Sequence, residues 1–173
     1  MTRFMADQDT SAADMGDAPL LNGADTGPAA GLISQYIKDL SFENPNAPAI
    51  YQNQAAPAVD VQFNIGGAQV GEEVHELVLK IEVRAETDGQ VAFIVDLSYA
   101  GLFGFRNVPT DQIQPFLMTE GPRLLFPFAR RVLADAVRDG GFPPLLLEPI
   151  DFGALYLQSQ DAQAQQTGTV GHA

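Results

Sequence analysis

The sequence predicts an α+β domain in which four antiparallel strands precede two C-terminal helices that pack on one face of the sheet. Between residues 32 and 100, apolar residues alternate with polar ones, which is the period of strands. From Ile113 to Ala136 they recur every three or four residues, which is the period of a helix. Strands grouped before helices are typical of the α+β class.

The first strand is predicted over residues 32–43, with Tyr36, Leu40 and Phe42 on one face and Asp39 and Glu43 on the other. Because the prolines at positions 45 and 48 lack a backbone donor, the chain must then leave the sheet and form a crossover loop up to residue 57. The second strand follows over residues 59–65 and ends at a Gly-Gly pair that permits a turn.

The third strand, residues 73–87, has the clearest pattern, because five apolar residues from Leu77 to Ala85 alternate with mostly charged ones. The Asp88-Gly89 pair that follows is the strongest short signal of a hairpin. The fourth strand, residues 91–100, is therefore predicted to pair back antiparallel.

The first helix is predicted to begin after Pro109, with Thr110 as its N-cap, and to end at Gly140. Three prolines inside it, at positions 115, 122 and 127, predict a kinked or two-piece helix, because an interior proline removes a hydrogen bond. A loop rich in proline and leucine leads to a short second helix that starts at Phe152 with Asp151 as its N-cap.

Both ends of the chain lack an apolar period and cannot offset the entropy of ordering. We therefore expect a disordered acidic N-terminal extension over residues 1–31, one folded domain over residues 32–158, and a flexible C-terminal tail over residues 159–173.

The charge balance indicates which partners are excluded. The chain has 22 acidic and 9 basic residues, so nucleic acid and anionic membrane surfaces are poor partners, whereas a basic protein surface is a good one. We found neither an apolar run of the ~20 residues that a membrane span needs nor a secretory signal, and we expect a cytoplasmic protein without direct membrane insertion. With no cysteine in the chain, disulfides and thiolate chemistry are excluded.

No pattern in the chain predicts catalysis, a metal site or a cofactor. The two histidines, His75 and His172, are not spaced as a ligand pair. Ser41, His75 and Asp39 could be combined into a triad, but nothing resembles a nucleophile elbow. A small hydrolase that uses surface carboxylates is therefore a distant hypothesis.

Three groups of residues are candidates for binding surfaces. An incomplete helix layer would leave Val95, Leu97 and Tyr99 in need of a second cover, so self-association is expected. Asp39 and Glu43 share one face of their strand, which spacing alone would assign to a solvated surface. The apolar loop from residue 142 to residue 147, and Tyr51, fit either a core or the lining of a groove.

Several stretches resemble the SecB family of bacterial protein-export chaperones. They are residues 38–48 (KDLSFENPNAP), 92–96 (AFIVD), 101–103 (GLF), 125–130 (LFPFAR), 141–143 (GFP) and 149–156 (PIDFGALY). The resemblance extends from about Ile33 to Gln158 without large gaps, so the folded domain is identified as SecB-like. Family members often carry a tryptophan in the crossover loop, where this sequence has Ala55 and Ala56.

The resemblance implies an ATP-independent chaperone that binds unfolded secretory precursor proteins in the cytosol and delivers them to SecA, the motor of the Sec translocase. It also implies a homotetramer built as a dimer of dimers, without a cofactor. The residues that match the family's tetramer interface are Val95, Leu97 and Tyr99. Those that match its SecA contacts are Asp39, Glu43, Ile94 and Asp96. Those that match its client groove are Tyr51, Val61, Phe63, Phe142, Leu145, Leu147 and Leu155.

A related binding module is the main alternative. A SecB-like holdase, or a chaperone dedicated to one partner of a toxin-antitoxin system, would have the same residues without a role in export. The sequence does not separate these functions.

Overall fold

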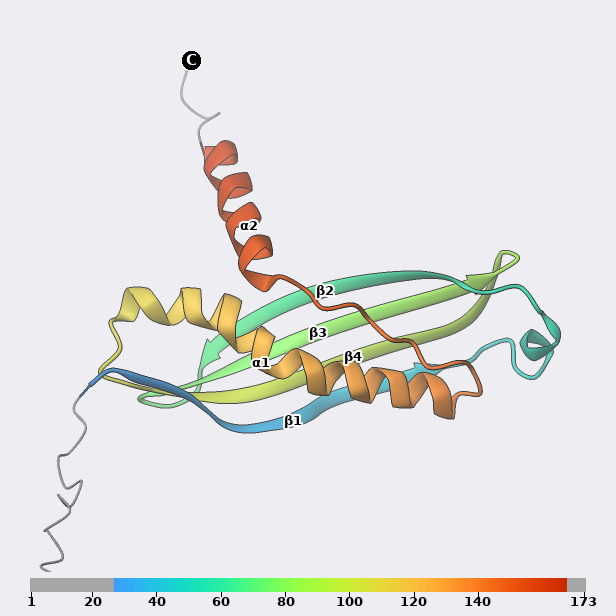
Figure 1. Ribbon diagram of the computed structural model, residues 1–173, viewed down its shortest axis with the longest axis horizontal. Helices are drawn as coiled ribbons and strands as arrows, with labels where there is room; N and C mark the ends of the chain where they lie inside the picture. Colours follow the sequence, from blue (N-terminus) through green and yellow to red (C-terminus); the bar gives the residue numbers. More distant parts are fainter. Residues whose placement is uncertain (1–26, 168–173) are drawn as a thin grey trace, which may run out of the picture.

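The computed structural model describes residues 27–167 of the 173-residue chain (Figure 1). The predicted N-terminal extension up to residue 26, and the end of the predicted tail from residue 168, lie outside the described residues. The elements, in chain order, are β1 (Ala29–Glu43), the 3-10 helix η1 (Ala49–Gln52), β2 (Ala58–Gln69), β3 (Val74–Thr87), β4 (Gln90–Arg106), α1 (Thr110–Asp139) and α2 (Phe152–Thr167). The predicted order of four strands followed by two helices is confirmed.

The four strands form one antiparallel sheet in the order β1-β4-β3-β2, so β1 and β2 are its two edges. The hairpin between β3 and β4 turns at Asp88 and Gly89, whose φ angles of 50° and 76° are both in the left-handed region. Two residues with positive φ define the type I′ turn, whose twist matches that of the strands on either side. The hairpin predicted at this pair is confirmed.

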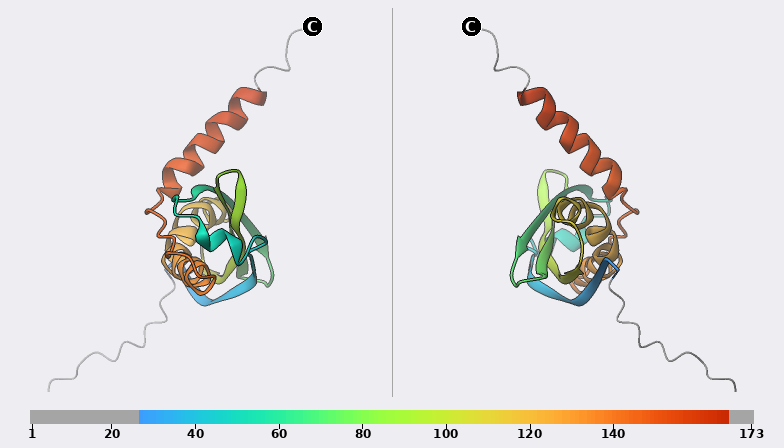
Figure 2. Two further views of the ribbon diagram at one scale, coloured as in Figure 1. Left: turned by 90° about the vertical axis from the view of Figure 1, so that its right-hand side faces the viewer. Right: turned by 90° about the vertical axis from the view of Figure 1, so that its left-hand side faces the viewer.

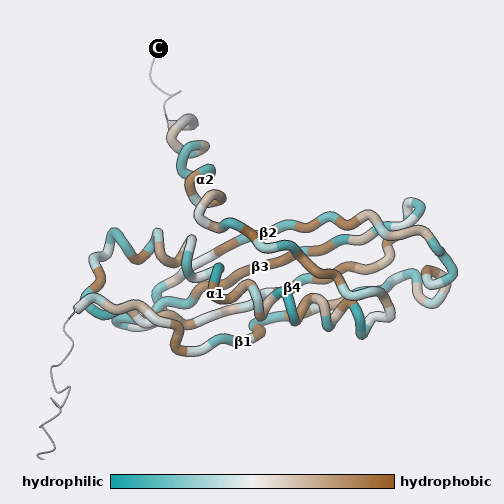
Figure 3. Tube along the Cα trace, in the orientation of Figure 1, coloured by the Kyte–Doolittle hydropathy of each residue, from teal (hydrophilic) through white to brown (hydrophobic). Residues whose placement is uncertain are grey.

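Helix α1 covers one face of the sheet, which we call the inner face (Figure 1). Seen end-on, the sheet curves around α1, and α2 projects away from it (Figure 2). The inner face takes alternate residues of each strand, and the colours along β3 in Figure 3 alternate between hydrophobic and hydrophilic residues accordingly. The fully buried residues include Leu77, Leu79 and Ile81 of β3 and Phe103 of β4.

One glycine allows α1 to lie this close to the sheet. A Cβ atom added at Gly121 would lie 2.6 Å from Cδ2 of Leu77 and 3.7 Å from Cζ of Phe103, and both of those side chains are fully buried. A larger residue at this position would therefore push the helix off the sheet, because packed side chains have no room to move.

The structure differs from the prediction for α1 in two respects. Of the two predicted forms, kinked or two-piece, the two-piece form is wrong, because α1 is a single helix that contains Pro115, Pro122 and Pro127 and whose axis bends along its length (Figure 1). Thr110 is its first residue, and the N-cap position is occupied by Pro109. The lost backbone bonds are offset by burial, since Pro122 is among the fully buried residues of the core.

The proposed need for a second cover over β4 is wrong. Val95 and Leu97 are fully buried and Tyr99 is 5% exposed within the single chain, because all three lie on the inner face beneath α1. Side chains in the core of one protomer need no second cover, and the match of Val95, Leu97 and Tyr99 to the family's tetramer interface stays a prediction.

Strand β1 departs from regular alternation. Its pairing with β4 shifts between Leu32 and Ser34 and again between Ile37 and Asp39. Each inserted residue reverses which face the preceding side chains point to. Tyr36 therefore pairs with Ala100 and lies on the same face as Asp39, not on the opposite face as predicted.

Helix α2 packs on α1 and not on the sheet. Its first residue, Phe152, is 3% exposed, and its ring lies 5.7 Å from that of Phe126 in α1. The carboxylate of Asp151 accepts a hydrogen bond of 2.9 Å from the backbone N–H of Ala154, which confirms the predicted N-cap. The helix continues to Thr167, so the folded part extends past residue 158, where we expected it to end.

Candidate polypeptide-binding site

A cavity of about 520 Å³ opens between the crossover loop and the segment that follows α1. We call it the apolar groove. Its apolar lining consists mainly of Ile50, Tyr51, Val59, Phe93, Phe142, Pro143, Pro144 and Leu145. The cavity lies at the end of the sheet where the β3–β4 hairpin turns, on the same side as α1.

Tyr51 ties the two walls of the apolar groove together. Its hydroxyl donates a hydrogen bond of 2.7 Å to the carbonyl oxygen of Gly140 and accepts one of 2.6 Å from Nδ2 of Asn44. The Tyr51 ring lies 5.4 Å from the ring of Phe142, which in turn lies 4.9 Å from Phe93 of β4. Tilted aromatic rings in contact with one another supply a wide apolar surface with few rotatable bonds.

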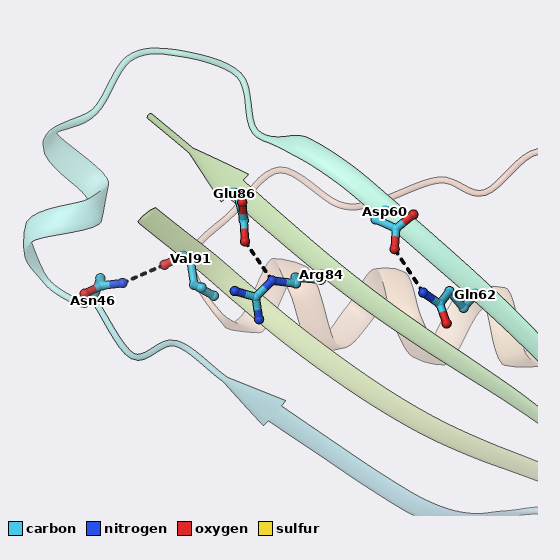
Figure 4. A network of polar contacts seen from close by, with 6 residues as sticks. All are labelled: Asn46, Asp60, Gln62, Arg84, Glu86 and Val91. Carbon is cyan, nitrogen blue, oxygen red and sulfur yellow. Dashed lines mark hydrogen bonds and ion pairs between the residues drawn. The ribbon is translucent and has the colours of Figure 1, made fainter. Parts of the chain in front are cut away.

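The loop is held to the sheet by a second contact. Nδ2 of Asn46 donates a hydrogen bond of 2.9 Å to the carbonyl oxygen of Val91 at the start of β4 (Figure 4). On the opposite wall, Gly141 has a φ of 85°, and a Cβ atom there would lie 3.1 Å from the Tyr51 ring. Glycine therefore provides both the turn and the space that the ring occupies.

The structure brings together three of the predicted client-groove residues, Tyr51, Phe142 and Leu145. The other four lie outside this cavity. Val61 and Phe63 are half-buried on the inner face of β2, Leu147 is buried in the core, and Leu155 is exposed on the first turn of α2. The sequence analysis missed Ile50, Val59 and Phe93, for which the only signal was their apolar character next to the crossover loop.

The outer face of the sheet, opposite α1, carries a regular grid of polar side chains. Residues opposite one another on neighbouring strands point to the same face, so the register defines three rows across the sheet. From β1 to β2 they are Glu43, Ile94, Arg84 and Asp60; Ser41, Asp96, Glu82 and Gln62; and Asp39, Ser98, Lys80 and Asn64. The four predicted SecA contacts therefore lie together on β1 and β4.

Ion pairs on this face are unevenly distributed. Nζ of Lys80 on β3 lies 2.5 Å from Glu82 and 3.3 Å from Asp96. Arg84 pairs with Glu86 at 2.7 Å, as Figure 4 shows. In the part of the chain that the structure describes, Asp39 and Glu43 are exposed and have no ion pair. Two carboxylates of β1 are thus available to a basic ligand.

A second polar network lies on the outer face towards the other end of β1. Glu76 accepts hydrogen bonds of 2.6 Å from Nζ of Lys38 and 2.5 Å from the hydroxyl of Tyr36. The hydrogen bond from Lys38, and after it the one from Tyr36, hold the pKa of Glu76 below its ordinary value. Together these two bonds outweigh burial, which acts to raise the pKa. The network ties β1 to β3 across β4.

The largest exposed apolar side chains include a group on β1 and α1. On β1 they are Leu32, Ile33, Ile37 and Leu40, between 36% and 61% exposed, and on α1 they are Leu124 and Phe128, at 37% and 42%. Leu32 and Leu125 both approach Gly101, so β1 and α1 adjoin there. We call these six residues the β1–α1 patch.

The described residues contain no group of three histidine, aspartate or glutamate side chains arranged to hold a metal ion. No helix in residues 27–167 is long and apolar enough to cross a bilayer.

An apolar groove on the helix side of the sheet and an acidic grid on the opposite face suit a polypeptide-binding protein of the α+β class. The family model for preprotein translocase subunit SecB matches residues 23–163. The chain belongs to the SecB family.

Similar proteins support this assignment over most of the chain. The protein-export protein SecB of Sphingopyxis alaskensis is 62% identical over 92% of this chain and 94% of its own length. That of Zymomonas mobilis is 58% identical over 82% of this chain and 87% of its own length. A SecB-like chaperone of Mycobacterium tuberculosis, solved in complex with a ChAD peptide from the HigA1 antitoxin, has the same fold, with a TM-score of 0.60 and 18% identity over 70% of this chain and 90% of its own.

Proposed function

We propose that this protein is an ATP-independent chaperone of the cytosol, which holds unfolded secretory precursors in the apolar groove and docks on SecA through the outer face of the sheet. The observation that carries the proposal is the separation of the two surfaces. The groove opens on the side of α1, whereas Asp39, Glu43 and Asp96 lie on the opposite face. A bound client would leave the acidic face free, which delivery to a second protein requires.

The chemistry of the groove suits unfolded polypeptides. Apolar contacts have no directional requirement and contribute ~25 cal/mol per Å² buried, so a groove lined by Tyr51, Phe93 and Phe142 can accept many sequences. Strand β2 is an edge of the sheet, and its unpaired backbone groups could bond an extended chain of any sequence.

The chemistry of the outer face suits a basic partner. Asp39 and Glu43 lie on one face of β1, next to Ile94 and Asp96 of β4. Charges on an exposed surface act over ~8 Å at physiological salt, so docking through them should weaken as salt is added.

We also propose a homotetramer, assembled as a dimer of dimers, with the β1–α1 patch as its exposed contact surface. The patch combines an open sheet edge with exposed leucine, isoleucine and phenylalanine side chains. Both features favour association, because burial removes apolar area from water and pairing satisfies the backbone groups of the edge.

A chaperone dedicated to a single partner is the second candidate. It is favoured by the likeness in fold to the Mycobacterium tuberculosis chaperone, which was solved with an antitoxin peptide. A chaperone of that kind would bind one defined segment and would not select unfolded chains in general.

The test is a titration of the full chain with one secretory precursor, kept unfolded in one arm and folded in the other, with the mass of the complex measured by light scattering. Tight binding of only the unfolded form by a tetramer is expected. Equal binding of both forms, or of neither, would refute the general chaperone and leave the dedicated partner. A second titration with SecA should lose at least tenfold in affinity in the double variant Asp39→Lys, Glu43→Lys.

A further inference from the structure

The two lysines of the chain, Lys38 and Lys80, both lie in the sheet and both are ion-paired to carboxylates of the outer face. Lys80 is the one within the acidic grid, where it is opposite Ser98 of β4 and four residues from Arg84 on the same face of β3. A cation at this position adjoins the surface that the proposed basic partner would occupy.

Lys80 is bonded to one of the carboxylates assigned to docking. Its Nζ lies 3.3 Å from Oδ2 of Asp96, and 2.5 Å from Oε1 of Glu82. The other carboxylate oxygen of Asp96 is buried and has no hydrogen-bond partner among the described residues. Asp96 therefore already shares the charge of Lys80 within the protein, whereas Asp39 and Glu43 have no ion pair in residues 27–167.

We infer that Lys80 is a built-in counter-ion of the docking face, which a lysine- or arginine-rich partner has to displace from Asp96 and which thereby raises the positive charge needed for docking. This inference rests on the proposed function of the outer face.

The energetics follow from competition between cations. In the parent protein, a partner ammonium that reaches Asp96 exchanges one ion pair for another, so little is gained. Without Lys80, the same contact is a new ion pair, and one repelling charge is removed as well. Hydrogen bonds to Glu82 and then to Asp96 raise the pKa of Lys80, so its ammonium stays charged and the competition persists at neutral and mildly basic pH.

The consequence is selectivity between the two surfaces of the protein. Unfolded precursors contain scattered basic residues. If the outer face had more unpaired carboxylates, it would attract the segments of a precursor that carry those residues. A bound cation next to Asp96 weakens these contacts and favours a partner whose basic residues are concentrated in one segment. Client segments are then left to the apolar groove.

Arg84 provides a matched control. It lies on the same strand and the same face as Lys80, and its loss changes the net charge of that face equally. Its Nε pairs with Glu86, which is not a predicted contact of the partner. The variant Arg84→Gln therefore measures the effect of net charge alone, whereas Lys80→Gln also frees Asp96.

The experiment measures the binding of a fluorescent 15-residue probe peptide, made only of lysine, arginine, glycine and serine, to the full chain by anisotropy. The probe lacks apolar side chains and is thus not a ligand for the groove. At 50 mM salt, we expect Lys80→Gln to bind it about three- to tenfold more tightly and Arg84→Gln less than about twofold more tightly. The gain should disappear near 0.5 M salt, and the affinity of Lys80→Gln should fall more steeply with salt than that of the parent protein.

Equal or weaker binding by Lys80→Gln, compared with Arg84→Gln, would overturn the role of Lys80. The double variant Asp39→Lys, Glu43→Lys separates this failure from that of the proposed function. If the double variant loses the probe while Lys80→Gln has no effect, only the counter-ion inference fails. If the double variant binds the probe as tightly as the parent protein does, the proposed docking role of the outer face is refuted, and the inference about Lys80 is refuted with it.

Discussion

The hydroxyl of Tyr51 donates a hydrogen bond of 2.7 Å to the carbonyl oxygen of Gly140, which lies 89 residues further along the chain. This bond connects the crossover loop to the end of α1, and the apolar groove lies between the two segments. The carbonyl of Gly140 also accepts a longer bond of 3.4 Å from Nδ2 of Asn44. The width of the groove therefore depends on a contact between two distant parts of the sequence.

Replacing Tyr51 by phenylalanine should remove this bond and keep the ring. We expect a loss of about 0.5–1.5 kcal/mol in the free energy of unfolding, measured by urea denaturation, because the Gly140 carbonyl loses a partner. Binding of unfolded clients should persist, since the aromatic surface remains. Tyr156→Phe is the control, and an equal loss in both variants would contradict the role of the bond.

Replacing Gly121 by alanine should destabilise the protein, although alanine is favoured over glycine in a helix by about 1 kcal/mol. The new methyl group would overlap Leu77, and overpacking of a filled core costs about 1–3 kcal/mol. Thermal unfolding should show a lower Tm. In Gly66→Ala, where a Cβ atom meets nothing within 4 Å, the Tm should barely change, and a stabilised Gly121→Ala would refute the close contact.

Replacing Glu76 by glutamine should lower stability only where the carboxylate is charged. Because the folded protein lowers the pKa of this group, its contribution is present above the ordinary value of 4.5 and is lost as the pH falls through the lower pKa of the folded state. At pH 7 the variant should be less stable by about 1 kcal/mol or less, given that Lys38 is half exposed. The difference from the parent protein should shrink in denaturation curves below pH 4.5. A difference that is constant across this range would rule out the ionised network.

Burial separates residues that hold the protomer together from those available for assembly. Leu97→Ala should cost about 2–5 kcal/mol of unfolding free energy, since Leu97 is fully buried in one chain. Phe128→Ser, at a position that is 42% exposed, should leave the fold of the protomer intact and reduce the mass measured by light scattering. If Phe128→Ser stayed fully assembled, the β1–α1 patch would have to be abandoned as the contact surface.

The regular parts of the fold could be predicted from the sequence, because β3 and β4 each have an unbroken alternation and Asp88-Gly89 has few alternatives to a hairpin. The bulges of β1 could not. Nothing in residues 36–39 signals an inserted residue, and the face of Tyr36 depends on its pairing with β4. The choice between one kinked helix and two pieces could not be made from the sequence either, since three prolines interrupt the helical pattern and the packing of Pro122 in the core becomes apparent only in three dimensions.

The candidate site was likewise predictable where its residues lie in a regular strand and not where they lie in loops. Pleat parity placed Ile94 and Asp96 on one face of β4, and the register confirms that this pair adjoins Glu43 and Ser41 of β1. The apolar groove was harder, because its walls come from segments far apart in the chain and their apolar residues have no shared period. For the same reason, burial of Leu147 in the core could not be distinguished from exposure in a groove.

The alternation of β4 has a consequence for how this protein can vary between species. Ile94 and Asp96 point to the outer face, while Val95 and Leu97, which alternate with them, are buried beneath α1. Deleting one residue from this stretch would bury the carboxylate and expose the core in a single step. Substitutions can change one surface at a time, but insertions and deletions cannot, so length differences among homologues should be confined to the loops and the chain ends.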